Sequence, residues 1–389
     1  MRPRRVLAIL IAIAVLLAVV YAGTPYARAL SLIVRAADLG GQVEAFANEQ
    51  ARAVTIQPPH LVPTRQGDVL ARFYEPEGAV SRTVLLMPGI HSMGIEEPRL
   101  RALANDLAGS GVRIMTFALP DLQQYRVTPQ SSDLIEDAIA WMARQPALAP
   151  DGRVGVVGVS FAGGLSLVAA GRPSVRDKVA FVVSFGGHGD LPRVLKYLST
   201  GQAPQVEGIE THPPHDYGVA VILYGLADHM VPAEQVAPLR AGVRTFLLAS
   251  QLTLVDMNQA NATFAKAREM ARALPDPAAT LLTYVNDRNV AKLGPALVPH
   301  LDKLGADSPA GSPERAPSLP SAPVYLLHGN GDTVIPTAES AILGEFLRNH
   351  GVEVHVLLSG LITHAEVDRS AAASETWKLV RFWASVLRQ

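Results

Sequence analysis

The chain contains no cysteine, which excludes disulfides, zinc–thiolate sites and a cysteine nucleophile. It also has no excess of either charge, since 34 Lys and Arg residues oppose 35 Asp and Glu residues. Without a basic surplus there is no electrostatic reason to expect a nucleic-acid partner, and none is predicted. Charged residues make up 18% of the chain against 49% hydrophobic residues, which favours a buried globular core over disorder.

The N-terminus is basic and then apolar. Three arginines in residues 2–5 precede Val6–Gly23, which carries no charge and approaches the roughly 20 residues that a membrane-spanning helix needs. Because the positive flank tends to stay in the cytoplasm, residues 1–24 are predicted to anchor the protein with its remainder on the extracytoplasmic side. The alternative is a signal peptide cleaved near Val20-Tyr21-Ala22, which would leave a secreted enzyme.

Four further segments follow this one. Residues 25–58 are predicted to form a helical juxtamembrane stalk, and strands then alternate with helices over 59–190 and again over 321–389. Apolar strands such as Val179–Phe185, alternating with helices, indicate an α/β fold with a mostly parallel, doubly wound sheet covered on both faces. Residues 191–320 have mainly helical patterns, and we expect them to form a helical cap inserted into the core.

A candidate nucleophile stands at the end of one strand. The apolar run Val154–Val159 leads to Ser160, and a helix follows. The pattern Gly158-x-Ser160-x-Ala162 is close to the nucleophile elbow, in which small residues allow the strand and helix to approach each other. Alanine replaces the last glycine and is small enough for this purpose. The alternative interpretation is an ordinary turn in which Ser160 caps the helix.

A serine nucleophile needs a base that is oriented by an acid, and on this type of sheet the acid and the histidine follow the serine in that order. Asp332 follows the strand Val324–Leu327, and His364 stands just beyond the strand Val352–Leu358. Both would project from the carboxyl ends of parallel strands, at the same sheet edge as Ser160. A turn-forming aspartate and a surface histidine are the simpler alternatives.

Several other polar residues are candidates for a functional role. Asp228 is a rival acid, but its flanking residues have a helical pattern. His91 and His188 follow strands and are predicted to line a substrate pocket, although a loop histidine without a catalytic role is the alternative. His212 and His215 are a weak ligand pair, so no metal site is predicted. No cofactor is expected either.

Acyl transfer also requires N–H donors for the developing oxyanion. The residue after the nucleophile, Phe161, supplies one backbone N–H in this arrangement, and the loop after an early strand supplies the other. In this chain that loop begins Pro88-Gly89, and we assign the second donor to Ile90. Pro88 occupies a position where such loops commonly have histidine.

These motifs together resemble the α/β-hydrolase superfamily, especially its dienelactone-hydrolase-like and bacterial esterase branches. The resemblance covers residues 65–190 and 320–389 and rests on Met87-Pro88-Gly89, Gly158 to Gly163, His328 to Pro336, and Thr363-His364. It implies a serine hydrolase that cleaves a small-molecule carboxylic ester through an acyl-enzyme. The alternatives are an acyltransferase or thioesterase with the same triad, and a catalytically silent binding protein of this fold.

Overall fold

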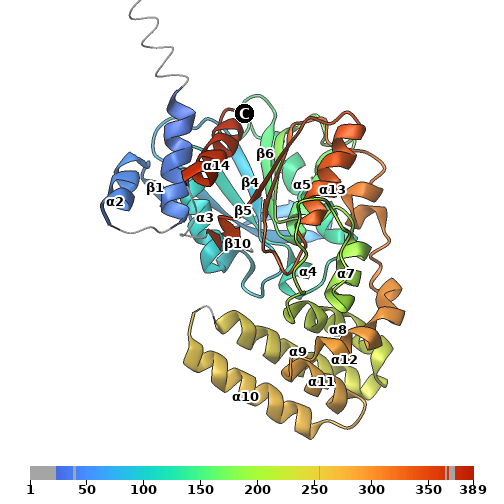
Figure 1. The fold of residues 1–389 in the computed structure, drawn as a ribbon. Coiled ribbons are helices and arrows are strands. Elements are labelled where there is room, and N and C mark those ends of the chain that lie inside the picture. The colour runs from blue at the N-terminus through green and yellow to red at the C-terminus, as the bar shows by residue number, and fades with distance from the viewer. Residues whose placement is uncertain (1–22, 38–40, 254, 364–365, 368–372) are drawn as a thin grey trace, which may run out of the picture.

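The computed structural model describes residues 23–37, 41–253, 255–363, 366–367 and 373–389 (Figure 1). It consists of a core built on a large sheet and a helical layer packed below it in the view of Figure 1. The charge-free segment expected to anchor the chain falls almost wholly in residues 1–22, outside the described residues. Over the described ranges, no helix has the length and apolarity required to cross a membrane.

The main sheet of the described chain has nine strands. They are β1 Val54–Ile56, β2 His60–Thr64, β3 Gly67–Pro76, β4 Thr83–Met87, β5 Arg113–Phe117, β6 Val154–Val159, β7 Val179–Phe185, β8 Val324–Gly329 and β9 Val354–Ser359. Their order is β1-β3-β5-β4-β6-β7-β8-β9, with β2 paired to β3 at the antiparallel edge. The strands from β5 to β9 are all parallel, so the predicted mostly parallel sheet is confirmed.

The order of the strands creates a switch point in the sheet. The chain leaves β4 for β5 on one side and then crosses back to β6 on the other side of β4. The connections that follow β4 and β6 therefore lead from the carboxyl ends of these strands to opposite faces of the sheet. The carboxyl ends at such a switch point are the place where open α/β sheets bind their ligands.

Helices cover both faces of the sheet (Figure 1). On one face, α5 Pro129–Ala143, α6 Phe161–Gly171 and α13 Ala338–Asn349 share an apolar core with the strands. On the other face, the helix over residues 23–36, α3 Pro98–Gly109 and α14 Ala373–Val386 do the same. The remaining core elements are α2 Gly41–Gln50, η1 Gly94–Glu96, α4 Pro120–Gln123 and the two-stranded pair of β10 Ile362–Thr363 and β11 Glu366–Val367.

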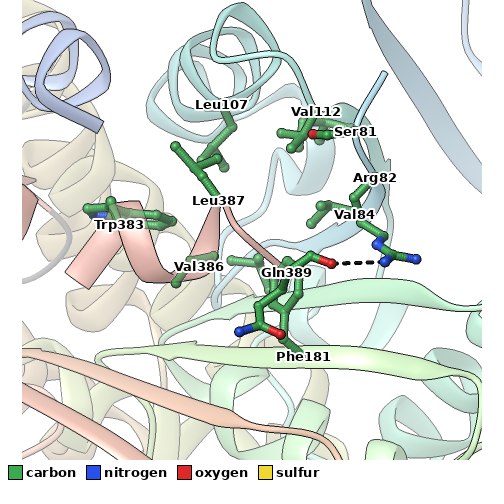
Figure 2. A pocket seen from close by; sticks show the side chains of 12 residues that line it. Ser81, Arg82, Val84, Leu107, Val112, Phe181, Trp383, Val386, Leu387 and Gln389 are labelled. Atoms are coloured by element: carbon green, nitrogen blue, oxygen red, sulfur yellow. Dashed lines mark hydrogen bonds between the residues drawn. The ribbon is translucent and has the colours of Figure 1, made fainter. Parts of the chain in front are cut away.

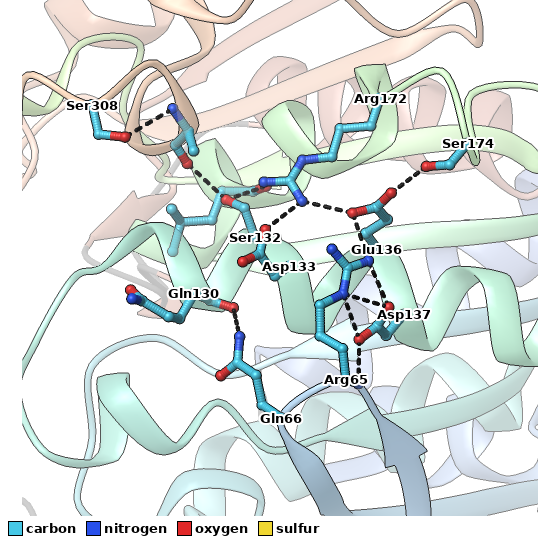
Figure 3. A network of polar contacts seen from close by, with 12 residues as sticks. Arg65, Gln66, Gln130, Ser132, Asp133, Glu136, Asp137, Arg172, Ser174 and Ser308 are labelled. Carbon is cyan, nitrogen blue, oxygen red and sulfur yellow. Dashed lines mark hydrogen bonds and ion pairs between the residues drawn. The ribbon is translucent and has the colours of Figure 1, made fainter.

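A network of ion pairs fastens α5 to its neighbours (Figure 3). Arg65, in the turn between β2 and β3, contacts Glu136 at 2.9 Å, and Arg172, just after α6, contacts Glu136 at 2.7 Å and Asp133 at 2.6 Å. Burial alone would raise the pKa of Glu136, but hydrogen bonds from Ser174 and Arg172 outweigh it and leave that pKa below its usual value. The ionised carboxylate therefore ties three elements together.

The N-terminal helix differs from the expected stalk over residues 25–58. Its Leu32 and Ile33 are buried against α3 and α14. Arg35 is 5% exposed and pairs with Asp106 of α3 at 2.8 Å. The end of the expected stalk is not helical, because residues 54–56 form β1 in the main sheet. These apolar and charged contacts make the segment part of the folded domain.

The C-terminal end of the chain closes the same face. Trp383 and Val386 of α14 lie over Phe181 of β7, and Figure 2 shows the small cleft left between them. The cleft holds about 10 Å³, which is room for a single water. Arg82 donates a hydrogen bond of 2.8 Å to the backbone oxygen of Gln389, so the last residue is held against the core.

The inserted cap is helical, as predicted. It contains α7 Leu191–Thr200, α8 Tyr217–Met230, α9 Ala233–Leu252, α10 Met257–Ala273, α11 Ala278–Asn286 and α12 Val290–Leu297, followed by the short 3-10 helices η2 Val298–Leu304, η3 Pro309–Gly311 and η4 Pro313–Arg315. These helices pack around a third apolar cluster, which also includes Tyr125, Phe161 and Ile335 of the core. The cap is therefore a second packed layer and not a loose loop.

One buried carboxylate holds the base of the cap, which we call the hinge clamp: Glu339, Gly189, Asp190, Arg193 and Glu314. Glu339 of α13 is fully buried and accepts hydrogen bonds from the backbone N–H groups of Gly189 and Asp190, at 2.9 and 3.1 Å. It also accepts from Arg193 of α7 at 2.5 Å, and Arg193 reaches Glu314 on the returning chain at 2.7 Å. Both crossings between core and cap are thus tied to α13.

The contact between the N-terminal helix and α3 can be tested by Arg35→Gln. The change leaves the partly buried Asp106 without its cation, and removing one partner of a largely buried pair costs about 2–4 kcal/mol of the free energy of unfolding. Urea denaturation should show this loss, whereas Arg176→Gln on the exposed surface should leave stability within about 0.5 kcal/mol. Equal stability of the two variants would show that the helix is not a structural part of the domain.

Candidate active site

Ser160 stands at the apex of the turn between β6 and α6. Its backbone has φ 55° and ψ −132°, a conformation that costs energy for any residue with a side chain. The turn is held in place by a hydrogen bond of 2.7 Å from the N–H of Ser160 to the carbonyl of Phe185, at the end of the neighbouring strand β7. The side chain is thereby carried to the carboxyl edge of the sheet, beside the switch point.

Steric contacts explain why the residues around Ser160 are small. A methyl group on Gly158 would lie 2.3 Å from the carbonyl oxygen of Ala162, and one on Gly163 would lie 2.4 Å from the Ser184 hydroxyl. The contact at Gly158 is with backbone atoms and cannot be relieved without moving the helix away from the strand, whereas at Gly163 the Ser184 hydroxyl would have to move aside. The Ala162 methyl, in contrast, is fully buried in the apolar core beneath the sheet. Alanine is therefore accepted at the position where the elbow pattern usually has glycine.

The loop after β4 lies directly against the serine. A methyl group on Gly89 would lie 3.0 Å from Cβ of Ser160, so the backbone of this loop passes close to the candidate nucleophile. Ile90 is the next residue, and it is partly buried. Phe161 begins α6, where backbone N–H groups have no carbonyl partner within the helix. The two predicted oxyanion donors, Ile90 and Phe161, thus directly follow Gly89 and Ser160, which lie against each other.

Asp332 follows β8 and is 3% exposed. Its Oδ1 accepts hydrogen bonds from the N–H groups of Val334 and Ile335, at 2.8 and 3.0 Å, so the carboxylate orients the turn and is oriented by it. Its Oδ2 lies 3.3 Å from Nε2 of His328. Asp332 therefore stabilises its turn, and this role is compatible with a second one as the catalytic acid.

Two residues beside Asp332 were missed from the sequence. His328 is fully buried, with Nδ1 2.7 Å from the Ser340 hydroxyl, and its Nε2 contacts the Asp332 carboxylate. Its position four residues before Asp332 was the available signal. Tyr197 comes from the cap helix α7; burial, and then the charge of Asp332, raise the pKa of Tyr197 to about 12. No sequence pattern links α7 to this carboxylate.

The predicted base, His364, lies outside the described residues. The chain immediately before it is described: β10, residues 362–363, lies against β8, the strand that leads to Asp332. The end of β8 is also joined to the end of β9 by a hydrogen bond of 3.0 Å from Asn330 to Ser359. The described chain up to residue 363 therefore lies beside the strand that leads to the candidate acid.

The remaining predicted residues occupy different environments. His91 is partly buried in the loop after β4, where burial lowers its pKa. His188 differs from the expected pocket-lining residue: it is fully buried under α6, with Nε2 2.8 Å from the carbonyl of Gly311 and its ring 5.6 Å from that of Phe161. Asp228, the rival acid, lies within α8 of the cap, half exposed and 3.2 Å from Arg240. It does not follow a strand of the sheet.

Neither a protein-family model nor a curated protein matches the chain. Among solved structures, it is similar to an esterase from Pyrobaculum calidifontis, with 16% identity, a TM-score of 0.48 and 92% of each chain covered. It is also similar to a thermostable esterase from Pseudomonas putida, with 13% identity, a TM-score of 0.47, and 89% of this chain and 88% of that one covered. A dienelactone hydrolase of Klebsiella pneumoniae matches with 12% identity, a TM-score of 0.42, and coverage of 87% and 99%.

The close approach of strand and helix predicts opposite results for two small substitutions. Gly158→Ala must push α6 away from β6 and displace Ser160, and a displacement of about 1 Å can cost about 100-fold in rate. Ala162→Gly restores the usual elbow pattern and should keep the rate within about threefold, with up to about 1 kcal/mol lost in stability. Ester hydrolysis and thermal unfolding measure both effects, and an active Gly158→Ala enzyme would contradict the geometry.

The buried histidine makes a prediction about pH. Burial lowers the pKa of His188 to about 4, whereas an unfolded histidine titrates near about 6.5. Between these values the unfolded chain binds a proton that the folded chain does not, so stability falls as the pH decreases from about 6.5 to about 4. At about 1.4 kcal/mol for each pKa unit, the loss from this group is about 3 kcal/mol.

Urea denaturation at pH 7, 5.5 and 4 tests this prediction. His188→Gln, which keeps a donor for the Gly311 carbonyl, should lose about 3 kcal/mol less than the unaltered protein over this pH range. The exposed His350 provides the control, and His350→Gln should show the same pH dependence as the unaltered protein. Parallel pH profiles for the His188→Gln variant and the unaltered protein would contradict the assignment.

Proposed function

We propose that the protein is a serine hydrolase of the α/β-hydrolase type, which cleaves carboxylic esters through Ser160, His364 and Asp332. The observation that carries the proposal is the strained backbone of Ser160 at the switch point, with the loop after β4 packed against it. Strain of this kind persists only where the surrounding structure enforces it, and it concentrates at functional sites. Gly89, Gly158 and Gly163 supply the close contacts that enforce it here.

The proposed reaction has two halves. Oγ of Ser160 attacks the ester carbonyl carbon while His364 takes the hydroxyl proton, and the N–H groups of Ile90 and Phe161 stabilise the oxyanion. His364 then returns the proton to the leaving alcohol, which leaves an acyl-enzyme. Water, activated by the same histidine, releases the carboxylic acid. Asp332 orients the imidazole and stabilises its positive charge, and it remains ionised throughout.

The environment of Asp332 supports this role. Its two backbone hydrogen bonds hold the carboxylate in one orientation without neutralising it. The nearby His328 contacts the Ser340 hydroxyl and the Ile335 carbonyl through its two ring nitrogens, so the orientation of its ring beside the carboxylate is fixed. A carboxylate held in this way is suited to orient the base that we propose, His364.

Substitution in the full-length protein tests the triad. Ser160→Ala should lower kcat for p-nitrophenyl butyrate by about 10³-fold or more and abolish labelling by a fluorophosphonate probe. Asp332→Asn should lower kcat by about 10³- to 10⁴-fold with little change in KM, because it disturbs the base and not the binding of substrate. The matched control is Asp177→Asn, on the exposed surface, which should leave both constants unchanged. Full activity of the Ser160→Ala enzyme would overturn the proposal.

We further propose that residues 1–24 anchor the enzyme in a membrane with the catalytic domain on the extracytoplasmic side. The support is the sequence itself: three arginines followed by an uncharged apolar run. Cell fractionation combined with the intact mass of the mature protein separates this from secretion. An intact N-terminus in the membrane fraction supports the anchor, and a soluble product that begins near Gly23 supports cleavage.

A further inference from the structure

A cavity of about 500 Å³ lies between the cap and the core, apart from the candidate active site. It is bounded by α7, α8 and η2 of the cap and by the loop of residues 124–128, which follows α4. Neither Ser160 nor Asp332 lines it. Its volume falls within the range of small-molecule binding sites, about 300–1,000 Å³, unlike the cleft in Figure 2.

One side of the cavity is apolar. Leu191 and Leu195 of α7, Val221 and Ile222 of α8, and Leu304 of η2 line it. Leu191 and Leu195 are almost fully buried in the cap core, so they form a fixed wall. A surface of this kind suits an alkyl or aryl group, because burying apolar area is favourable by about 25 cal/mol per Å².

The polar side of the cavity is predominantly cationic. Arg126, Arg240 and Lys303 line it, and Asp228 is the carboxylate among the lining residues. Asp228 pairs with Arg240 at 3.2 Å. Arg126 lies 3.9 Å from Asp121, beyond hydrogen-bond distance, and its side chain is 53% exposed. Lys303 pairs with its sequence neighbour Asp302 at 2.8 Å, and both side chains are about half exposed. The lining therefore carries more positive than negative charge.

The wall next to Arg126 is held in an unusual conformation. Tyr125 has φ 59°, which is rare for a bulky residue and persists only under structural constraint. Its ring packs edge-on against Tyr217 and Tyr224 of α8, at 6.4 and 6.1 Å between centroids. Arg240 lies over the ring of Tyr224 and donates to its backbone carbonyl at 3.1 Å. These contacts fix the cavity wall and one of its cations before any ligand arrives.

We propose that this cavity binds a medium-chain amphipathic anion, with its alkyl chain against the α7–α8 wall and its carboxylate at Arg126 and Lys303. Guanidinium and ammonium groups are the usual partners of carboxylates, and charge-assisted hydrogen bonds are about twice as strong as neutral ones. The ligand is either a free fatty carboxylate or the distal end of an ester substrate. The binding itself does not depend on hydrolysis at Ser160.

Isothermal titration calorimetry of the full-length protein with decanoate tests the proposal. We expect one site per chain with a Kd on the order of 10–100 μM. Decanol, which has the same chain length without the charge, should bind about tenfold more weakly. The double variant Arg126→Gln/Lys303→Gln should weaken decanoate binding by about tenfold or more. The matched control, Lys266→Gln/Arg268→Gln on the exposed face of α10, should bind as the unaltered protein does.

A second variant tests the position of the ligand without changing charge. Val221→Trp fills the cavity from α8 and should abolish binding of decanoate; circular dichroism verifies that the variant is folded. The proposal is overturned if decanoate does not bind, or if it binds equally well to the Arg126→Gln/Lys303→Gln protein. Decanoate should also bind normally to Ser160→Ala, so this test is independent of the proposed reaction.

The two sources of the anion give different kinetics. If the cavity receives the distal end of the substrate, decanoate will raise KM for a long-chain p-nitrophenyl ester that ends in a carboxylate, in proportion to its occupancy, and leave kcat unchanged. KM for p-nitrophenyl butyrate, whose acyl chain is short and uncharged, should not rise. If the cavity holds a separate fatty carboxylate, KM will not rise with occupancy. In either case the Arg126→Gln/Lys303→Gln variant should lose any effect of decanoate over the same concentration range.

Discussion

The position of the cap depends on the hinge clamp centred on Glu339. A buried carboxylate is costly unless hydrogen bonds and a cation compensate for its lost hydration. Here the compensating groups come from the chain as it leaves the sheet, from the first cap helix and, through Arg193, from the returning chain. Because Tyr197 lies on the same helix as Arg193, this clamp also places Tyr197 near Asp332. The cap wall of the large cavity is fixed through the same helix.

The core contributes a different kind of constraint, which is steric. The strand and helix around Ser160 approach so closely that a side chain at position 158 would collide with the backbone of the helix, and one at position 163 would crowd Ser184 and Gly187. This packing and the backbone hydrogen bond to Phe185 hold the serine in its strained conformation. In the proposed enzyme, rigid strand ends would carry the chemistry, and the cap helices would shape the space around it. Because of this division, the sequence of the cap can change without disturbing the position of Ser160.

Much of this arrangement could be predicted from the sequence, because apolar strands buried on both faces and cap helices with clear periodicity leave strong local patterns. The prediction failed where a long-range contact decides the structure. The N-terminal helix joins the core through Arg35 and Asp106, which are 71 residues apart. His188 is fully buried because the returning chain at Gly311 covers it, 123 residues later. Tyr197 reaches the site from the insertion, and no periodicity in one segment can reveal its partner in another.

The packing of residues 23–36 onto the sheet has a consequence for how the enzyme would meet its substrate. If residues 1–24 anchor the protein as proposed, the helix over residues 23–36 begins within the anchor and is already fixed to α3 and α14. The domain would then have little freedom to swing away from the bilayer, and the sheet edge at Ser160 would stay within a narrow range of heights above it. Such an enzyme would sample molecules at the lipid surface more readily than those in the surrounding solution.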